Sequence, residues 1–329
     1  MPTINHKGKT LKTRIFKEEL SDEFCDIIRE ELFRKPSKGD VDAELKSIFN
    51  GANKHPKIER YYFRDIMYKT RVYYSKWSIE EFMECNDLIR HSFGRISSNS
   101  KLYYSDNDLV NLEKFFSLGS KGVATKPTNF PIKTADEIIK MYNKNGNYYD
   151  YSCGWGVRML SAMRNGVNYF GTDPNYLLTE RLDELKDDYK RVNGLNTKVD
   201  IRTQGSEVFI EEWRNSMGLA FSSPPYFALE DYRVGEQSYK DGVTYDEWLN
   251  GYFDGTISNI REYLIDDGYL ILNIKNYDKY DLISDCIKVC ERYGFKLINI
   301  HNLKNVQRIT CKGDLKDNSE GLYVFVKQI

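Results

Sequence analysis

The turn Asp150-Tyr151-Ser152-Cys153-Gly154-Trp155-Gly156 is the most informative stretch of this 329-residue chain for predicting its fold. It joins an expected strand at 148–152 to an expected helix at 155–164. Two glycines one residue apart let the backbone approach a ligand closely, and the start of the helix offers free N–H groups. The dinucleotide pattern GxGxxG and the P-loop pattern GxxxxGK[ST] are absent. The stretch therefore either cradles a different ligand or is only a tight turn.

Strands and helices alternate through the rest of the chain after residue 123. The expected strands are 148–152, 169–172, 199–203, 219–222, 269–274, 296–303 and 321–327, and the expected helices are 155–164, 179–192, 245–264 and 281–293. Strands separated by helices imply right-handed crossovers and a largely parallel sheet. The last two strands are joined without a helical pattern, so we expect them to pair antiparallel. The prediction is an α/β, Rossmann-like sheet of seven strands, preceded by a helix that begins at a capping box of Thr134 and Glu137.

Residues 1–122 have a different character and predict a mostly helical N-terminal domain, separate from a domain at 123–329. Ser21, Ser105 and the capping box of Ser78 with Glu81 mark expected helix starts. The glycine- and lysine-containing stretch 119–127 resembles a linker between the two domains.

A basic and aromatic segment at 54–77 is the candidate for contact with a nucleic acid. It holds seven basic and two acidic residues, interleaved with tyrosine, phenylalanine and tryptophan. Basic groups meet phosphates, and aromatic faces stack on bases. The candidate contacts are Lys57, Arg60, Tyr61 and Arg64. The alternative is a strand pair or helix whose aromatic side chains are core and whose charges are solvated.

Composition limits the classes of protein that this chain can be. It is 40% hydrophobic with a net charge of −1, and the near-neutral charge counts against strong non-specific DNA binding. It has no uncharged apolar run of 18 residues and no signal-peptide core, so we expect a cytoplasmic protein, in a bacterium or in the host of a phage, without contact to a membrane. Its six cysteines form no CxxC pair, and we expect buried thiols and no metal site.

Asp173 follows the second expected strand, 17 residues after Gly156. An acidic residue about 20 positions beyond a glycine turn is placed to accept hydrogen bonds from ribose hydroxyls. The alternative is that Asp173 caps the next helix.

Ser222-Ser223-Pro224-Pro225-Tyr226-Phe227 ends the fourth expected strand. Two prolines fix the backbone and remove two N–H donors, which leaves carbonyl acceptors beside a serine hydroxyl and an aromatic ring. Such a set suits a planar group that carries an NH₂. A structural turn with Tyr226 in the core is the alternative.

Together these stretches resemble the DNA amino-methyltransferases, which act on adenine N6 or cytosine N4. Their hallmark [DNS]-P-P-[YF] is matched by Ser223-Pro224-Pro225-Tyr226, which the resemblance makes the catalytic residues. Their motif Asp-Pro-Phe-x-Gly-x-Gly is matched in part from Asp150 to Gly156, with Tyr151 and Ser152 in place of Pro-Phe. The resemblance covers about residues 123–329. It implies the class I methyltransferase sheet and S-adenosylmethionine as cofactor.

The resemblance also assigns residues to the cofactor. Asp173 takes the ribose position, Ser206 lies where the cofactor adenine is met, and Phe130 lies in the segment that holds the methionine end. Arg158 is either a contact of the cofactor carboxylate or a surface helix residue. The cofactor-binding set is Asp150, Ser152, Gly154, Gly156, Asp173, Ser206, Phe130 and Arg158. The resemblance also makes Phe227 an expected contact of the target base.

The activity that the resemblance implies is methyl transfer from S-adenosylmethionine to an exocyclic amino group of a DNA base, as in restriction–modification. Target recognition then falls to residues 1–122 and to the loops at 230–244 and 306–320. Two alternatives stay open: the same chemistry on RNA, and an inactive methyltransferase-fold protein that binds nucleic acid. The target base, the recognition sequence and the oligomeric state do not follow from the sequence.

Overall fold

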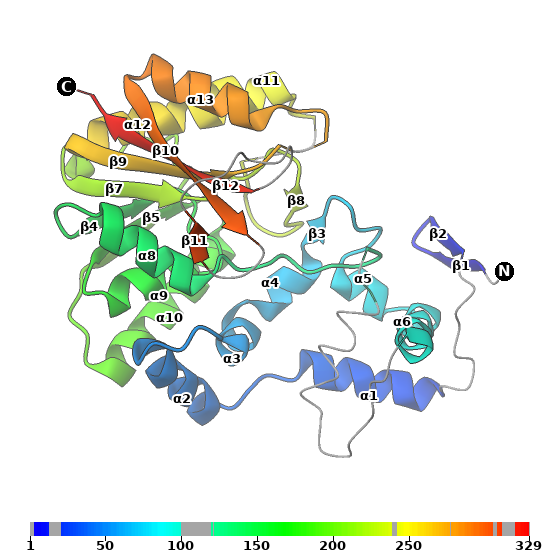
Figure 1. The fold of residues 1–329 in the computed structure, drawn as a ribbon. Coiled ribbons are helices and arrows are strands. Elements are labelled where there is room, and N and C mark those ends of the chain that lie inside the picture. Colours follow the sequence, from blue (N-terminus) through cyan, green and yellow to red (C-terminus); the bar gives the residue numbers. More distant parts are fainter. Residues whose placement is uncertain are drawn as a thin grey trace. The chain divides into compact units, whose positions relative to one another are not determined.

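A mixed β-sheet carries the strand–helix pattern predicted for the C-terminal part of the chain. The computed structural model describes residues 3–12, 21–99, 120, 122–238, 242–276, 278–304, 308–310 and 320–328. The strands of the sheet are β4 (Asn147–Asp150), β5 (Asn168–Asp173), β6 (Val199–Thr203), β7 (Met217–Ser222), β9 (Leu264–Ile274), β10 (Phe295–Lys304), β11 (Arg308–Thr310) and β12 (Gly321–Lys327). Their order across the sheet is β11-β10-β12-β9-β7-β4-β5-β6 (Figure 1).

The pairing of the strands confirms the predicted fold class. β6, β5, β4, β7 and β9 pair parallel, and β12 pairs antiparallel with both β9 and β10. All seven predicted strands are present, including the antiparallel last pair. The short strand β11, at 308–310, adds an eighth strand inside the segment that was expected to be a loop.

Helices cover both faces of the sheet (Figure 1). α8 (Ile132–Tyr142), α9 (Val157–Arg164) and α10 (Tyr176–Asn193) lie on one face, and α12 (Asp254–Tyr263) and α13 (Leu282–Arg292) lie on the other. α8 begins before Thr134, with Pro131 at its N-cap position, so the predicted capping box of Thr134 and Glu137 is wrong. The fixed φ of proline suits a helix start, and Thr134 is instead buried inside the first turns.

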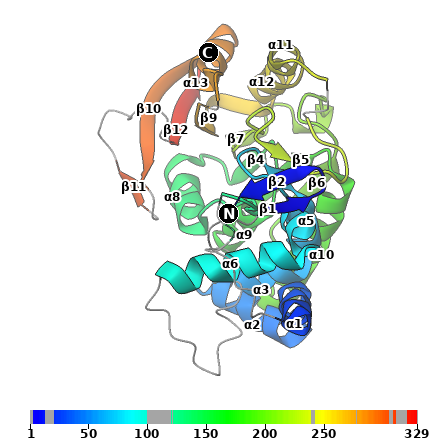
Figure 2. The same ribbon diagram turned by 90° about the vertical axis from the view of Figure 1, so that its right-hand side faces the viewer.

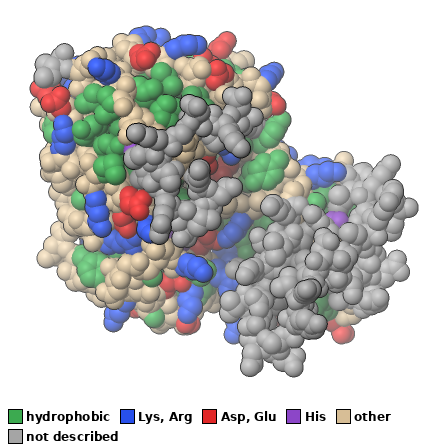
Figure 3. Space-filling view, viewed as in Figure 1, with side chains coloured by type: hydrophobic (Ala, Val, Ile, Leu, Met, Phe, Trp, Pro, Cys, Tyr) green, Lys and Arg blue, Asp and Glu red, His purple; other side chains and the backbone are tan. Residues whose placement is uncertain are grey.

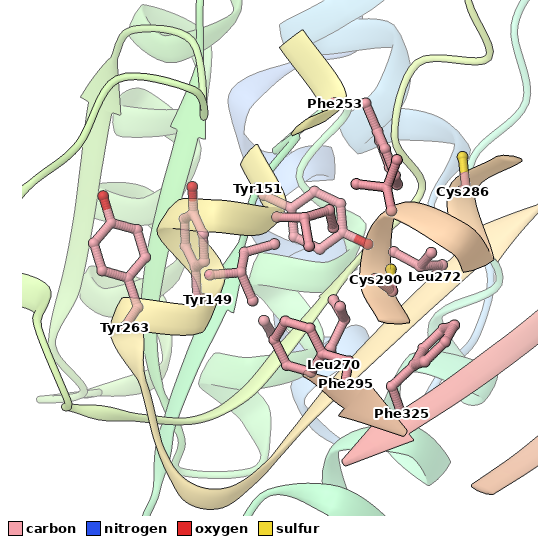
Figure 4. Packing of buried hydrophobic residues seen from close by; sticks show 14 of the residues in the cluster. Tyr149, Tyr151, Phe253, Tyr263, Leu270, Leu272, Cys286, Cys290, Phe295 and Phe325 are labelled. Atoms are coloured by element: carbon pink, nitrogen blue, oxygen red, sulfur yellow. The ribbon is translucent and has the colours of Figure 1, made fainter. Parts of the chain in front are cut away.

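The main hydrophobic core lies between the sheet and the face that α12 and α13 cover. Its buried members include Tyr149, Tyr151, Trp213, Trp248, Phe253, Tyr263, Leu270, Leu272, Cys286 and Cys290. Figure 4 shows the ring of Tyr151 beside Leu272 and Cys290. Burial raises the pKa of the Cys286 and Cys290 thiols well above the usual value. Both cysteines are therefore protonated core residues at neutral pH.

The described chain divides into two units. Unit 1 comprises Met1–Pro36, Arg64–Thr128 and Glu230–Val234, and unit 2 comprises Ser37–Phe63, Asn129–Leu229 and Gly235–Ile329, with the sheet. This division differs from the expected boundary at 122/123, because residues 37–63 belong with the sheet. Their helix α2 (Lys38–Phe49) packs on α10, and Arg164 of α9 donates to the carbonyls of Ile48 and Ala52 at 3.0 Å each.

Unit 1 is built mainly from helices. Its elements are α1 (Asp22–Phe33), α4 (Arg64–Lys69), α5 (Ile79–Met83), α6 (Asn86–Asn99), the hairpin β1 (Thr3–His6) and β2 (Lys9–Lys12), and the pair β3 (Arg71–Val72) and β8 (Glu230–Asp231). α6 packs against α1 and α5 (Figure 2). The predicted caps at Ser21 and at Ser78 with Glu81 are confirmed, whereas the helix expected after Ser105 lies outside the described residues. No helix in the described ranges is long and apolar enough to cross a bilayer.

Candidate functional site

The carboxyl ends of β4, β5 and β7 bring the predicted motifs to one edge of the sheet. β4 and β7 are neighbours, yet the chain visits β5 and β6 on the other side of β4 before it returns to β7. Open α/β sheets bind ligands outside the strand ends where the strand order reverses in this way. The glycine turn that follows Asp150 and the double proline that follows Ser222 therefore flank this reversal point.

Asp150 and Arg158 form a buried ion pair beneath the glycine turn. The Arg158 Nε and Nη2 atoms donate to the two carboxylate oxygens of Asp150 at 2.9 and 3.1 Å, and Asp150 is 0% exposed. Arg158 Nη2 also donates to the Ser152 carbonyl and to Ser222 Oγ, the latter at 3.1 Å. Burial alone disfavours the guanidinium charge, but the Asp150 carboxylate outweighs it, so the pKa of Arg158 is raised.

The placement of Arg158 excludes one of the two alternatives predicted for it. It is not a surface helix residue, because it is 7% exposed. Its guanidinium donates to Asp150, Ser152 and Ser222. The pair thus ties the turn after β4 to the end of β7.

The two glycines of the turn have different physical roles. Gly154 has a φ of 55°, and a Cβ there would have no neighbour closer than 3.9 Å. Gly156 has a φ of 76°, and its Cβ would lie 2.7 Å from Leu182 Cδ2 of α10. Gly156 is therefore required by helix packing, whereas a Cβ at Gly154 would make only ordinary van der Waals contacts with Arg158 Nη2 and the Ser152 carbonyl.

Asp173 holds the glycine turn from the next strand. Its Oδ2 accepts from the Gly154 N–H at 3.2 Å and its Oδ1 from the Asn175 N–H at 3.0 Å. The N-cap of α10 is Asn175, which accepts from the Leu177 N–H, so the alternative of Asp173 as the cap is wrong. Burial raises the pKa of Asp173 to about 6, although the hydrogen bonds from the Asn175 and Gly154 N–H groups act to lower it. A carboxyl of this kind is able to accept ribose hydroxyls once it is ionised.

Tyr151, which departs from the resembling motif, serves the core. Its hydroxyl donates to the Ile271 carbonyl at 2.9 Å and to the Ser222 carbonyl at 3.2 Å. Its neighbour Cys153 is buried, and burial raises the pKa of that thiol well above its usual value. Trp155 packs edge-to-face on Phe63 with ring centroids 6.0 Å apart. The bulky residues of this turn are therefore packed in buried regions.

The Ser223–Tyr226 motif is tied to the ends of β9 and β12. Asn273 Nδ2 donates to Ser223 Oγ at 2.7 Å and to Glu320 Oε1 at 2.8 Å. The Tyr226 hydroxyl donates to the Asn273 carbonyl at 2.8 Å and to Glu320 Oε1 at 3.3 Å. Pro224 is buried, and Pro225 and Tyr226 are partly exposed.

The sequence reasoning missed Asn273 and Glu320. A signal existed for Asn273, the one polar residue in the apolar run 270–274. Nothing in the sequence around Glu320 marks it as a site residue, because it reaches this position only through the pairing of β12 with β9.

Phe227, predicted to contact the target base, is a core residue. It is 7% exposed and packs edge-to-face on Tyr245 and Tyr280, with centroids 5.6 and 5.3 Å away. Its φ of 54° is uncommon outside glycine, so the chain turns sharply right after Tyr226. This turn places the two neighbouring rings in different surroundings.

Phe130 and Ser206 both lie in unit 2 with the strand ends. The Phe130 ring packs edge-to-face on Phe221 at 5.3 Å and lies 6.0 Å from the Arg158 guanidinium carbon. Ser206 Oγ pairs with Thr256 Oγ1 at 2.7 Å, and its carbonyl accepts from Asn259. The Ser206 side chain and carbonyl are thus both occupied by α12.

The predicted nucleic-acid contacts lie along the helical run from Pro56 to Lys69 and have different surroundings. Lys57 pairs with Asp40 at 2.7 Å, and Tyr61 packs on Tyr62 with centroids 4.9 Å apart; Arg60 is partly exposed. These residues belong to unit 2, whereas Arg64 belongs to unit 1. Arg64 is 5% exposed and donates to the carbonyls of Leu32 and Arg34.

Arg64 is therefore a structural residue that satisfies the C-terminal carbonyls of α1, and its prediction as a phosphate contact is wrong. The aromatic residues Tyr62, Phe63, Tyr68 and Trp77 of the same segment are buried. Tyr73 and Tyr74, at 54% and 57% exposure, are its exposed rings. On the described part of the face in Figure 3, Lys and Arg side chains lie among Asp and Glu side chains.

Comparisons with known proteins give structural neighbours only. No protein-family model matches the sequence, and no curated protein matches it. Among solved structures, the chain is similar to a TehB-like SAM-dependent methyltransferase from Corynebacterium glutamicum, with 18% identity, a TM-score of 0.42, and coverage of 60% of this chain and 88% of that one.

Two further neighbours are similar to a comparable degree. One is magnesium protoporphyrin IX methyltransferase from Synechocystis, solved with bound SAM, at 12% identity, a TM-score of 0.40, and coverage of 60% and 79%. The other is a SAM-dependent O-methyltransferase from Thermotoga maritima, at 13% identity, a TM-score of 0.40, and coverage of 62% and 68%. The fold assignment itself rests on the strand order and pairing described above.

Proposed function

We propose that this protein is an S-adenosylmethionine-dependent methyltransferase that methylates the exocyclic amino group of a base in DNA, adenine N6 or cytosine N4. The observation that carries the proposal is the pairing of β4 with β7 at the reversal point of the sheet. It sets the glycine turn and the Ser223-Pro224-Pro225-Tyr226 motif on neighbouring strand ends. The glycine turn would hold the cofactor that donates the methyl group, and the Ser223–Tyr226 motif would hold the amine that receives it.

The residues present fit the cofactor. Gly154 has no side chain and is partly exposed, so a group can lie against its backbone, and the buried Asp173 carboxyl beside it suits ribose hydroxyls. Asp150 and Arg158 hold the turn from below rather than contacting the cofactor. When bound, the cofactor supplies a methyl group on a sulfonium as the electrophile.

The chain's own residues orient the nucleophile. An exocyclic base amine is a weak nucleophile, because its lone pair is delocalised into the ring. Ser223 Oγ and the Pro224 carbonyl accept the amine hydrogens, which favours a pyramidal nitrogen with a directed lone pair. The Tyr226 ring stacks on the base, and extrusion of the base from a duplex costs a few kcal/mol. Catalysis by orientation and proximity needs no metal ligand from the protein.

The affinity for S-adenosylhomocysteine, the demethylated product, is expected to depend on pH through Asp173. Ribose hydroxyls donate to the ionised carboxyl, so binding favours the deprotonated form. The raised pKa of about 6 then gives a constant affinity above about pH 7 and a loss of about tenfold per unit below pH 6. Titration calorimetry from pH 5 to 8 measures this. Asp173→Asn binds more weakly and without the pH dependence, and a wild-type affinity that does not change over this range contradicts the role.

The substrate class is tested by transfer of a tritiated methyl group from S-adenosylmethionine to unmethylated DNA of mixed sequence or to RNA. We expect label on DNA from the wild-type protein. Pro225→Ala restores an N–H and frees the backbone, so it is expected to transfer about tenfold less label, because small misplacements are costly in oriented reactions. Label on RNA alone keeps the chemistry and changes the substrate.

An inactive protein that binds nucleic acid is the remaining alternative, and the atypical Tyr151-Ser152-Cys153 motivates it. Binding of S-adenosylhomocysteine by calorimetry without label on DNA or RNA would favour that alternative over the enzyme.

A further inference from the structure

Glu320 ends the segment between β10 and β12 and lies beside the Ser223–Tyr226 motif. One Asn273 amide nitrogen donates to both Ser223 Oγ, at 2.7 Å, and Glu320 Oε1, at 2.8 Å. The same Oε1 accepts from the Tyr226 hydroxyl at 3.3 Å. A carboxylate from a distant part of the chain is thus held next to the two side chains that are expected to contact the target base.

The orientation of the Asn273 amide is fixed by this carboxylate. A carboxylate only accepts, so the NH₂ of Asn273 must face Glu320. This orientation leaves Asn273 Oδ1 buried without a hydrogen-bond partner in the described part of the chain. An unsatisfied buried acceptor costs about 1–3 kcal/mol. The fold accepts this cost and keeps both Ser223 Oγ and Glu320 in place, which points to a functional reason.

Two donors occupy Oε1 of Glu320, and Oε2 has no hydrogen-bond partner among the described residues. Glu320 is partly exposed. Because two donors hold Oε1, the carboxylate is oriented and Oε2 is its remaining acceptor. Glu320 thus brings a carboxylate into the hydrogen-bonded network of Ser223, Tyr226 and Asn273.

We propose that Glu320 is the proton acceptor of the methyl transfer, with Asn273 as its positioning residue. The inference rests on the proposed function. In the step, the amine nitrogen forms a bond to the methyl carbon with its lone pair, while the electrons of the breaking carbon–sulfur bond remain on sulfur. The nitrogen becomes cationic and gives one of its protons to Glu320 Oε2. The carboxylate stabilises the developing charge before it takes the proton.

Glu320→Gln separates proton acceptance from positioning. A glutamine oxygen still accepts from Asn273 and Tyr226, but the side chain takes no proton. We expect the single-turnover rate of methyl transfer to mixed-sequence DNA to fall about 10- to 100-fold. The DNA concentration for half-maximal rate and the affinity for S-adenosylhomocysteine are expected to change little.

Two further variants complete the test. Glu291→Gln makes the same chemical change at an exposed position of α13, and it is expected to react like wild type. Glu320→Ala removes the hydrogen-bond scaffold as well. A Glu320→Gln rate within about threefold of wild type, or loss of rate in Glu320→Ala alone, overturns the inference and leaves the proposed function standing. A wild-type protein that transfers no methyl group overturns both.

Discussion

Arg158→Ala is expected to lower the free energy of unfolding by about 3–5 kcal/mol, because it leaves a buried carboxylate without its partner. Asp150 is fully buried, and Arg158 supplies two charged hydrogen bonds to it. The Tyr169 hydroxyl, which donates to Asp150 Oδ2 at 3.0 Å, is the remaining donor to that carboxylate from a side chain. One neutral donor does not replace a guanidinium.

Urea denaturation of the purified variants measures this loss. Arg181→Ala, which removes an arginine from a partly exposed pair with Glu184 on α10, is the matched control, and its cost is expected to stay below about 1 kcal/mol. The double variant Arg158→Leu/Asp150→Asn removes the orphaned charge and is expected to regain part of the stability. If Arg158→Ala lowered the free energy of unfolding no more than Arg181→Ala does, the Asp150–Arg158 pair would have to be accessible to solvent.

Tyr226→Ala is expected to lower the rate of methyl transfer about 100-fold, because base stacking on an aromatic ring contributes about 1–3 kcal/mol and the hydroxyl contacts are also lost. The affinity for S-adenosylhomocysteine is expected to stay unchanged, since the Tyr226 hydroxyl is bound to Asn273 and Glu320 at the ends of β9 and β12. Single-turnover rates with saturating cofactor measure the change.

Tyr226→Phe is the matched control for the ring. It keeps the aromatic face and removes the hydroxyl that donates to the Asn273 carbonyl and to Glu320. We expect a smaller loss than in the alanine variant. Equal rates for Tyr226→Ala and wild type would mean that the ring is only a structural part of the turn, as the alternative interpretation of Pro-Pro-Tyr holds.

The order of strands and helices was predictable from the sequence because each element is encoded locally. Apolar runs bounded by turns gave the strands, and the carboxyl-end rule for parallel sheets placed Gly154, Asp173 and Ser223 on one edge. The two glycines of the turn look alike in sequence, yet only the contact with Leu182 shows that Gly156 serves packing.

Partners that are distant in sequence were not predictable. Nothing in the sequence around Arg158 indicates that it forms an ion pair with Asp150. Nothing in residues 37–63 indicates that they pack with the sheet domain through α10. Arg64 reads as a phosphate contact in a basic segment, but its guanidinium caps α1. Glu320 reaches Tyr226 only because β12 pairs with β9.

Identification of the methylated nucleoside tests the central claim most directly. The wild-type protein is incubated with S-adenosylmethionine and unmethylated DNA, the DNA is digested to nucleosides, and these are separated and weighed by mass spectrometry. The account predicts N6-methyldeoxyadenosine or N4-methyldeoxycytidine, since it proposes that Ser223 and Pro224 accept the hydrogens of an amine. Methylation at a ring carbon, as in 5-methyldeoxycytidine, or no methylated nucleoside at all, would contradict it.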